Sequence, residues 1–212
     1  MLRVNNLIIA ALVTVLSASV SASSENTEWK LAKEKKGIKA YTREVAGSEF
    51  YEAKLVTEFD ASMDTVMAEV IGDFDRCAKW VKMCKLSKVL KKISDTELYA
   101  YSVLDFPFFM EDRDIVNHYV LSKDPTTHAV TISLNSASDQ YPSQEGKVRM
   151  ESKVLYTIKP ISDNKVEFVW QVHSNPGGGI SPGMVNSQLP SQTVSDLLTL
   201  RDLIEERKNK KL

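Results

Sequence analysis

Few of the residue types that carry out chemistry lie at catalytic spacing in this chain. Its three histidines, His118, His128 and His173, are scattered, and none stands where a set of metal ligands or a cysteine partner would need it. The chain contains no Gly-x-Ser-x-Gly turn, phosphate-binding glycine loop or paired-histidine motif. We therefore predict no catalytic site, no metal and no cofactor, and we expect a protein that is not an enzyme.

The two cysteines, Cys77 and Cys84, are the remaining reactive side chains. On one unbroken helix their Cα atoms would lie about 10 Å apart, which is too far for a disulfide. The residues around Trp80 indicate that a helix ends between them, so we predict a Cys77–Cys84 disulfide. The alternative is a pair of free thiols, with Cys77 simply buried.

The first 22 residues have the pattern of a secretory signal peptide. A short positive start (Met1–Arg3) precedes ten mainly apolar residues (Leu7–Leu16) and a small-residue cleavage site (Val20–Ala22). Because a membrane-spanning helix needs about twenty apolar residues, we expect cleavage after Ala22 rather than a retained anchor. The protein is then expected in the periplasm or outside the cell.

Residues 23–212 are predicted to form a single domain, long enough to bury a substantial core. Loss of Arg3 leaves 27 − 1 = 26 basic residues against 28 acidic ones, a net charge near −2. This balance provides no basic field for nucleic acid or for anionic membranes. We therefore expect no nucleic-acid partner.

One stretch near the C-terminus organises the predicted fold. Val166–His173 alternates apolar and polar residues, as a half-buried strand does. Asn175–Gly179 then ends the strand, and Ser181–Pro182 is typical of a helix start. A long helix with a broad apolar face follows to the basic tail. We predict that the residues joining strand and helix form a hinge: Pro176, Gly177, Gly178 and Gly179.

The rest of the chain is expected to form further strands and short helices. The patterns predict helices over residues 27–36, 63–71 and 74–81, with Gly37 ending the first, and strands over residues 38–45, 50–59, 85–93, 97–104, 112–121, 130–136 and 148–159. Tight turns between successive strands favour antiparallel pairing. The prediction is an α+β fold in which a strongly curved antiparallel sheet holds the long helix on its concave face, around either a packed core or a cavity.

Three stretches, in this order, together resemble the START family of lipid-transfer domains. They are Asp73–Leu90 around Trp80, Phe106–Val116 with its proline and Arg113-Asp114, and Pro176–Asn186. The similarity runs from about Trp29 to Arg207. It implies a bacterial, secreted or periplasmic member with a helix-grip fold. In that fold the sheet and the last helix enclose a tunnel for one lipid, under a lid that must shift for entry.

The resemblance also directs attention to side chains within the tunnel. Sterol-binding members carry an acidic residue and an arginine there, and these positions fall on Tyr101 or Ser102 and on Tyr119 here. Their hydroxyls can still hydrogen-bond a polar head. Arg113 either binds a head group or fixes the turn together with Asp114. The candidate lipid-binding residues are Tyr101, Ser102, Arg113, Tyr119, Trp170, Met184 and Val185.

Two prolines complete the expected gate. Pro182 begins the last helix, and Pro190 should remove the hydrogen bond to the Asn186 carbonyl and kink that helix. The segment before Pro190, which carries Met184, could then move separately. Phe106–Met110 is either a gate loop that touches a membrane or a buried corner between strands.

The predicted function is binding of a single lipid and its transfer through an aqueous compartment. The expected partners are a lipid ligand (a phospholipid, a sterol or another hydrophobic molecule) and, transiently, a membrane, and the protein is expected to be a monomer. Two alternatives stay open: a polyketide cyclase or aromatase-like enzyme of the same fold, and a sensor that binds a ligand without moving it.

Overall fold

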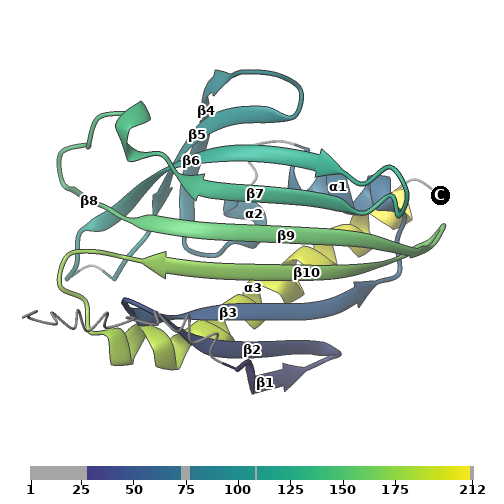
Figure 1. The fold of residues 1–212 in the computed structure, drawn as a ribbon, viewed down its shortest axis with the longest axis horizontal. Helices are drawn as coiled ribbons and strands as arrows, with labels where there is room; N and C mark the ends of the chain where they lie inside the picture. The colour runs from purple at the N-terminus through teal and green to yellow at the C-terminus, as the bar shows by residue number, and fades with distance from the viewer. Residues whose placement is uncertain (1–27, 73–76, 108, 211–212) are drawn as a thin grey trace, which may run out of the picture.

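A computed structural model describes residues 28–72, 77–107 and 109–210. Its centre is a curved ten-stranded sheet in the order β1-β2-β3-β10-β9-β7-β6-β5-β4, with β8 paired to β6 (Figure 1). Every pair is antiparallel except β6 with β8. The predicted α+β helix-grip architecture is therefore confirmed, although the sheet has more strands than the sequence patterns indicate.

Along the described residues, three strands are followed by two short helices, seven further strands and one long helix. The strands are β1 (Lys30–Lys35), β2 (Ile38–Val45), β3 (Ser48–Phe59), β4 (Cys84–Lys92), β5 (Glu97–Leu104), β6 (Asp112–Lys123), β7 (Val130–Ser136), β8 (Lys147–Arg149), β9 (Glu151–Ser162) and β10 (Lys165–Asn175). The helices are α1 (Met63–Val70), α2 (Cys77–Trp80), the short 3-10 helix η2 (Ser138–Gln140) and α3 (Pro182–Lys210).

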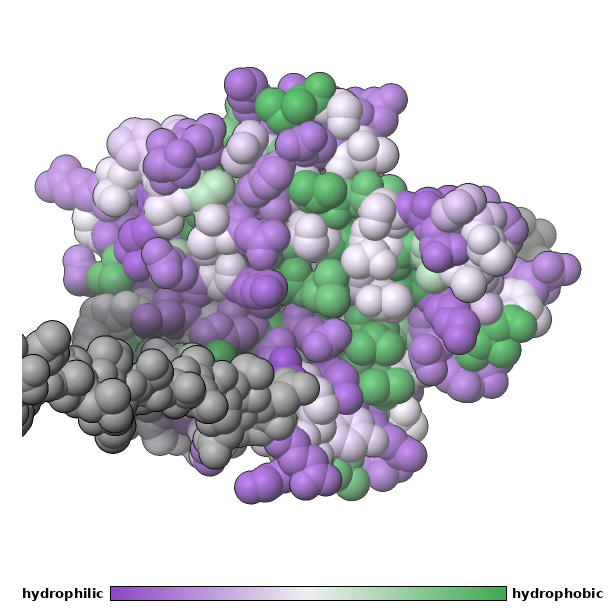
Figure 2. Space-filling view, viewed as in Figure 1, coloured by the Kyte–Doolittle hydropathy of each residue, from purple (hydrophilic) through white to green (hydrophobic). Residues whose placement is uncertain are grey.

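Helix α3 crosses the concave face of the sheet, behind the strands in Figure 1. Its C-terminal half is fully packed, since Leu197, Leu200 and Ile204 are at most 2% exposed and join one core cluster with Phe59 and Phe168. Burying a side chain of this size contributes roughly 1.5–3 kcal/mol, so this half holds the helix on the sheet. The opposite face of the sheet, seen in Figure 2, is largely hydrophilic, with apolar residues over its middle.

The predicted first helix is wrong, because residues 30–35 form the edge strand β1. Lys36 and Gly37 both adopt positive φ angles (49° and 74°), which is the backbone of a tight hairpin turn rather than of a helix end. Gly37 does take the left-handed conformation expected of it, but it connects β1 to β2. Four of the six β1 residues are lysine or glutamate, so β1 has no apolar face by which to recognise a strand.

The α1–α2 region matches its prediction where the structure describes it. The Ser62 side chain accepts a hydrogen bond from the Thr65 amide at the start of α1, as a helix cap does. Helix α2 ends at Trp80, and Cys77 and Cys84 form the predicted disulfide with a Cα–Cα distance of 5.8 Å. The signal peptide expected over residues 1–22 and the part of the predicted helix before Cys77 lie outside the described residues.

The start of α3 is placed as predicted, at Pro182. The helix continues through Pro190, and the Thr193 hydroxyl donates to the Leu189 carbonyl one turn back. The first turns are also tied to the sheet, because the Asn186 amide donates to the Glu49 carbonyl and accepts from the Tyr51 amide, both at 2.9 Å. Separate movement of the segment before Pro190 must therefore break these two bonds.

Candidate functional site

A cavity of about 1150 Å³ lies between the N-terminal half of α3 and the sheet, and we call it the hollow. This volume is slightly above the roughly 300–1,000 Å³ of small-molecule sites. Its walls are formed mainly by β10, the β10–α3 loop, α3, the β5–β6 loop and the α2–β4 turn. Its main apolar wall residues are Val81, Met83, Leu104, Phe106, Pro107, Phe109, Met110, Met150, Trp170, Val172, Pro176, Ile180, Met184, Val185 and Leu189.

The local sequence explains why these side chains face the same space. Trp170, Val172 and Ser174 alternate along β10 and therefore share its inner face. On α3, Val185, Leu189, Thr193 and Asp196 recur at spacings of three and four, which keeps them on one stripe of the helix. The stripe passes from the hollow into the packed core between Asp196 and Leu197.

A second depression of about 740 Å³ lies at the other end of α3 and differs in character. Its charged residues are already engaged: Arg201 donates to the Lys36 carbonyl and to the Thr57 hydroxyl, and Lys165 pairs with Glu58 at 2.5 Å. A lipid chain would desolvate these groups without replacing their bonds, so the hollow is the better candidate site.

The predicted binding residues divide into three groups. Trp170, Met184 and Val185 line the hollow, as does Pro176 of the predicted hinge. Ser102 and Tyr119 point to the same inner side of the sheet but lie among other residues: Ser102 is buried opposite Ser87, and Tyr119 packs against the main core. Burial raises the pKa of Tyr119 to about 12, so its hydroxyl stays protonated at neutral pH.

Tyr101 is placed away from the hollow. It belongs to the outer face of β5, where its ring packs on Tyr141 with centroids 5.0 Å apart. Burial, followed by the charge of Asp114, raises the pKa of Tyr101 to about 12. Asp114 in turn accepts two hydrogen bonds from Arg149, at 2.8 and 3.0 Å. These contacts organise the outside of the sheet.

Arg113 is the residue that joins the two loops at the mouth of the hollow. Its side chain is buried, donates to the carbonyls of Glu111, Pro176 (3.0 Å) and Gly177 (3.3 Å), and lies 4.4 Å over the Phe106 ring. The β5–β6 loop and the β10–α3 loop are thus held to one guanidinium. We call this contact the latch. All three guanidinium nitrogens of Arg113 donate hydrogen bonds in the latch. This arrangement fits a structural role for Arg113 better than binding of a lipid head group.

The glycines beside the latch have the unusual backbone that the sequence indicates. Gly177, Gly178 and Gly179 all adopt positive φ angles, of 62°, 64° and 69°. A Cβ at position 178 would lie 2.7 Å from Nη2 of Arg113, whereas a Cβ at position 179 would meet nothing within 4 Å. The three glycines therefore serve both the loop conformation and the close approach of the latch.

This difference provides a matched pair of variants. We expect Gly179→Ala to lower the free energy of unfolding by about 1–2 kcal/mol, the cost of a left-handed alanine. Gly178→Ala should cost about 2 kcal/mol more, because its methyl group must also displace the Arg113 guanidinium. Urea denaturation of the two variants measures the difference. Equal losses would mean that the latch contributes nothing at this contact.

The rim of the hollow is apolar and exposed. Phe109, on the β5–β6 loop, is 69% exposed, and Met184, in the first turn of α3, is 39% exposed. These two segments frame the opening of the hollow.

Within the described residues no helix is long and apolar enough to cross a membrane, and no group of three or more His, Cys, Asp or Glu side chains is placed to hold a metal ion.

The long helix over a curved antiparallel sheet agrees with what comparison with known proteins finds. The family model described as START domain matches residues 12–209. The chain belongs to the START domain family. It is 30% identical over 200 residues to the uncharacterized protein PA1579 of Pseudomonas aeruginosa, covering 92% of this chain and 97% of that protein. It is 25% identical to the phosphatidylcholine transfer protein of Rattus norvegicus, covering 75% of each.

Solved START structures show the same arrangement of sheet and helix. The STAR-related lipid transfer protein of Xanthomonas axonopodis aligns with a TM-score of 0.76 and 31% identity, over 84% of this chain and 98% of that one. The human StAR-related lipid transfer protein 5 aligns with a TM-score of 0.77 over 84% of this chain and 86% of its own, but its 16% identity shows the fold alone.

Asp196 is the site residue that sequence reasoning missed. It occurs within the apolar stripe of a predicted helix, at the spacing of Leu189, Thr193 and Leu200. An acidic residue on the buried stripe of a helix is the signal that would have found it, since charges there are rare without a partner or a role.

Proposed function

We propose that this START domain binds a single lipid in the hollow and carries it through an aqueous compartment. The family and its lipid-transfer relatives support lipid binding or transfer as the general class of function. The observation that carries the specific proposal is the hollow itself, a large and mainly apolar space beside the N-terminal half of α3.

The energetics explain why a carrier needs such a space. Burial of one methylene contributes about 0.8 kcal/mol, so exposing a sixteen-carbon chain to water costs roughly 13 kcal/mol. An apolar hollow replaces the bilayer interior and keeps transfer nearly balanced in free energy. Trp170 Nε1 is buried with no acceptor within the described chain, and a bound ligand or water would supply one.

The gate in this proposal consists of the latch loops and the first turns of α3. Opening requires breaking the Arg113 bonds to Pro176 and Gly177 and the Asn186 bonds to the start of β3. Three consecutive glycines with positive φ and a proline inside α3 are features that permit such a local movement. The protein then needs a low barrier for opening more than a high affinity.

The proposal is tested by filling the hollow. Val172 lies on the inner face of β10 and lines the hollow, whereas Val169 lies on the outer face of the same strand. We expect purified protein to carry one lipid per chain in native mass spectrometry, and Val172→Trp to reduce both this occupancy and transfer between donor and acceptor vesicles at least tenfold. Val169→Trp is the control. Equal transfer by the two variants, or a wild-type protein that takes up no lipid, would refute the proposal.

Transient contact with the membrane is proposed to occur at the exposed rim. Burying a phenylalanine contributes roughly 1.5–3 kcal/mol, so Phe109→Asp should slow transfer about tenfold or more. Leu31, which is 55% exposed on β1, provides the control Leu31→Asp. A flotation assay with vesicles measures the binding directly, and the same loss in both variants would remove the rim from the mechanism.

We also propose that residues 23–212 form the mature domain, in the periplasm or outside the cell, after cleavage following Ala22. The Cys77–Cys84 disulfide supports an oxidising compartment. The intact mass of the exported protein tests the cleavage site, and a mass that includes residues 1–22 would contradict it.

A further inference from the structure

Asp196 is the one buried acidic residue among the described residues that line the hollow, and carrying an apolar chain does not require it. Asp196 is the innermost of the α3 residues that line the hollow, and it is only 2% exposed. A buried carboxylate costs several kcal/mol of hydration unless ion pairs or hydrogen bonds replace the lost water. Its partners therefore decide what it can do.

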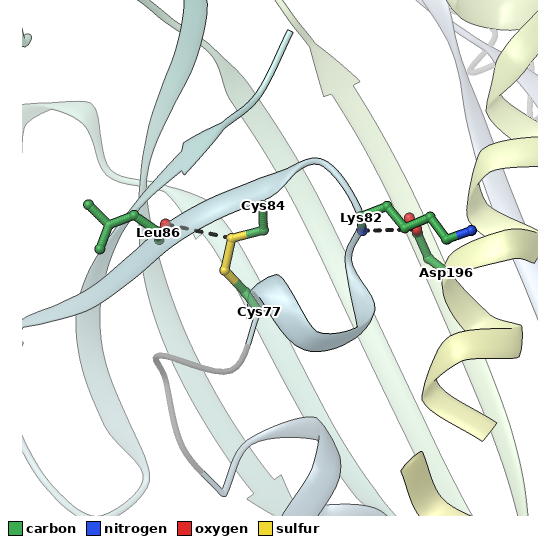
Figure 3. The surroundings of a disulfide bond; sticks show 5 residues. All are labelled: Cys77, Lys82, Cys84, Leu86 and Asp196. Carbon is green, nitrogen blue, oxygen red and sulfur yellow. Dashed lines mark hydrogen bonds between the residues drawn. A yellow bond between two sulfur atoms is a disulfide. The ribbon is translucent and has the colours of Figure 1, made fainter. Parts of the chain in front are cut away.

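The protein supplies Asp196 with less than a carboxylate can accept. Oδ1 accepts a hydrogen bond from the Lys82 backbone amide at 3.1 Å, as Figure 3 shows. The Lys82 ammonium is directed elsewhere, to the Ser195 hydroxyl at 2.6 Å. No cationic side chain of the described residues forms a salt bridge with Asp196. A carboxylate has about four acceptor sites, so Asp196 retains capacity to accept further hydrogen bonds.

The Lys82 contact is itself held in place. Lys82 lies on the turn between α2 and β4, and the Cys77–Cys84 disulfide closes this turn on both sides (Figure 3). The carboxylate is thus held on the wall of the hollow by a hydrogen bond from a covalently braced turn.

One aromatic ring of the lining, Trp170, belongs to a cluster of three rings. The Trp170 indole lines the hollow, and Trp80 and Tyr156 pack against it with centroids 5.5 and 5.9 Å away. Indole and phenol rings present negative faces that attract cations, most strongly where water is excluded. A carboxylate beside such rings is an arrangement suited to a positively charged nitrogen.

The charges around the hollow favour the same sign of ligand. Its lining contains two lysines, Lys82 and Lys85, against four carboxylates, Asp105, Glu111, Asp112 and Asp196. Lys85 is already paired with Asp105 and Asp112, at 2.6 and 3.1 Å. Lys82 is then the one cation of the described lining outside an ion pair, so a net anionic head group would meet an excess of negative charge.

We infer that Asp196 determines head-group specificity by selecting lipids that carry a positively charged nitrogen, either a primary or a quaternary ammonium. The inference rests on the proposed lipid binding and names the ligand class of the same site. The ammonium lies against the Asp196 carboxylate and the Trp170 ring, and the acyl chains occupy the apolar remainder of the hollow. Lipids with only anionic groups in the head are disfavoured.

The test is a competition among head groups with identical acyl chains. Protein is incubated with vesicles that contain equal amounts of phosphatidylcholine, phosphatidylethanolamine and phosphatidylglycerol, and the lipids bound to the re-isolated protein are quantified by mass spectrometry. The wild type should enrich the two ammonium lipids over phosphatidylglycerol, and their ratio to each other distinguishes a quaternary from a primary ammonium. Asp196→Asn, which keeps an acceptor for the Lys82 amide, should lower the enrichment at least tenfold. Asp202→Asn, the same change at an exposed position of α3, should leave it unaltered.

A second measurement uses the unmodified protein. The titratable groups that face Asp196 from neighbouring elements are Lys82 of the α2–β4 turn and Tyr156 of β9, and burial raises the pKa of the Tyr156 hydroxyl. Burial raises the pKa of Asp196 to about 6. Enrichment of ammonium lipids should therefore be high at pH 8 and lost at pH 5.

The outcomes separate the two proposals. Lipid uptake without enrichment, or equal enrichment by wild type and Asp196→Asn, overturns the role of Asp196 while the carrier function stands. Wild-type protein that takes up none of the three lipids overturns the carrier function and this inference with it.

Discussion

Asp196→Asn is expected to make the lipid-free protein more stable, not less. Burial raises the pKa of this carboxyl from 3.8 to about 6, so the folded state binds the proton more tightly than the unfolded chain does. Stability is then highest below about pH 4 and falls as the pH rises through about 6, where the ionised form must be buried. At pH 7 the shift corresponds to about 3 kcal/mol, since one pKa unit is 1.36 kcal/mol.

The asparagine variant removes this cost while keeping the bond from the Lys82 amide. Urea denaturation of delipidated protein between pH 4 and pH 8 measures it: the wild type should lose stability over this range relative to Asp196→Asn, and the two should converge near pH 4. Parallel curves would show that Asp196 is not a buried, unneutralised charge. A residue that destabilises the empty protein yet is positioned by a disulfide-closed turn is understandable if the ligand compensates for it.

Arg113→Met is expected to have an effect of similar size and opposite sign. The substitution leaves the carbonyls of Glu111, Pro176 and Gly177 without their shared charged donor, which we expect to cost about 3 kcal/mol. For a domain of this size the midpoint of thermal unfolding should fall by about 6–12 °C. Because the same bonds join the two mouth loops, release of bound lipid should become at least tenfold faster.

The control for Arg113→Met must lose stability without touching the mouth. Ile158 is fully buried on β9 in the main core, and Ile158→Ala should cost about 2–5 kcal/mol. Stopped-flow dilution of a fluorescent lipid complex compares the release rates. If Ile158→Ala releases lipid as fast as Arg113→Met, release follows global unfolding and Arg113 does not act as a latch.

The sequence predicts most of the sheet because its strands alternate apolar and polar residues over a buried face. β5 and β7 occupy the predicted residues, and β10 extends its prediction by one residue at the start and two at the end. β1 was missed because its residues are largely exposed on both faces, so nothing in their order distinguishes a strand from a helix. Edge strands of this kind are defined by the neighbour with which they pair, here β2.

The site was only partly predictable for a similar reason. The motif around Arg113 indicates its importance, but the roles of Arg113 and Asp114 depend on the face of β6 from which each projects and on partners far away in the chain. Arg113 reaches Pro176 and Gly177, whereas Asp114 pairs with Arg149. The position of the Asp196 carboxylate likewise depends on distant partners, the Lys82 amide and the disulfide that closes its turn. Contacts between distant segments are what local patterns do not contain.

The position of β10 in the sheet has a consequence for how this protein comes into being. β10 lies between β3 and β9, so one of the last strands to be synthesised joins the N-terminal hairpins to the rest, with Val166 opposite Phe59. Until it emerges, β3 and β9 each lack a neighbour, and such distant pairings form slowly, in milliseconds to seconds. The growing polypeptide therefore stays open until nearly all of it exists.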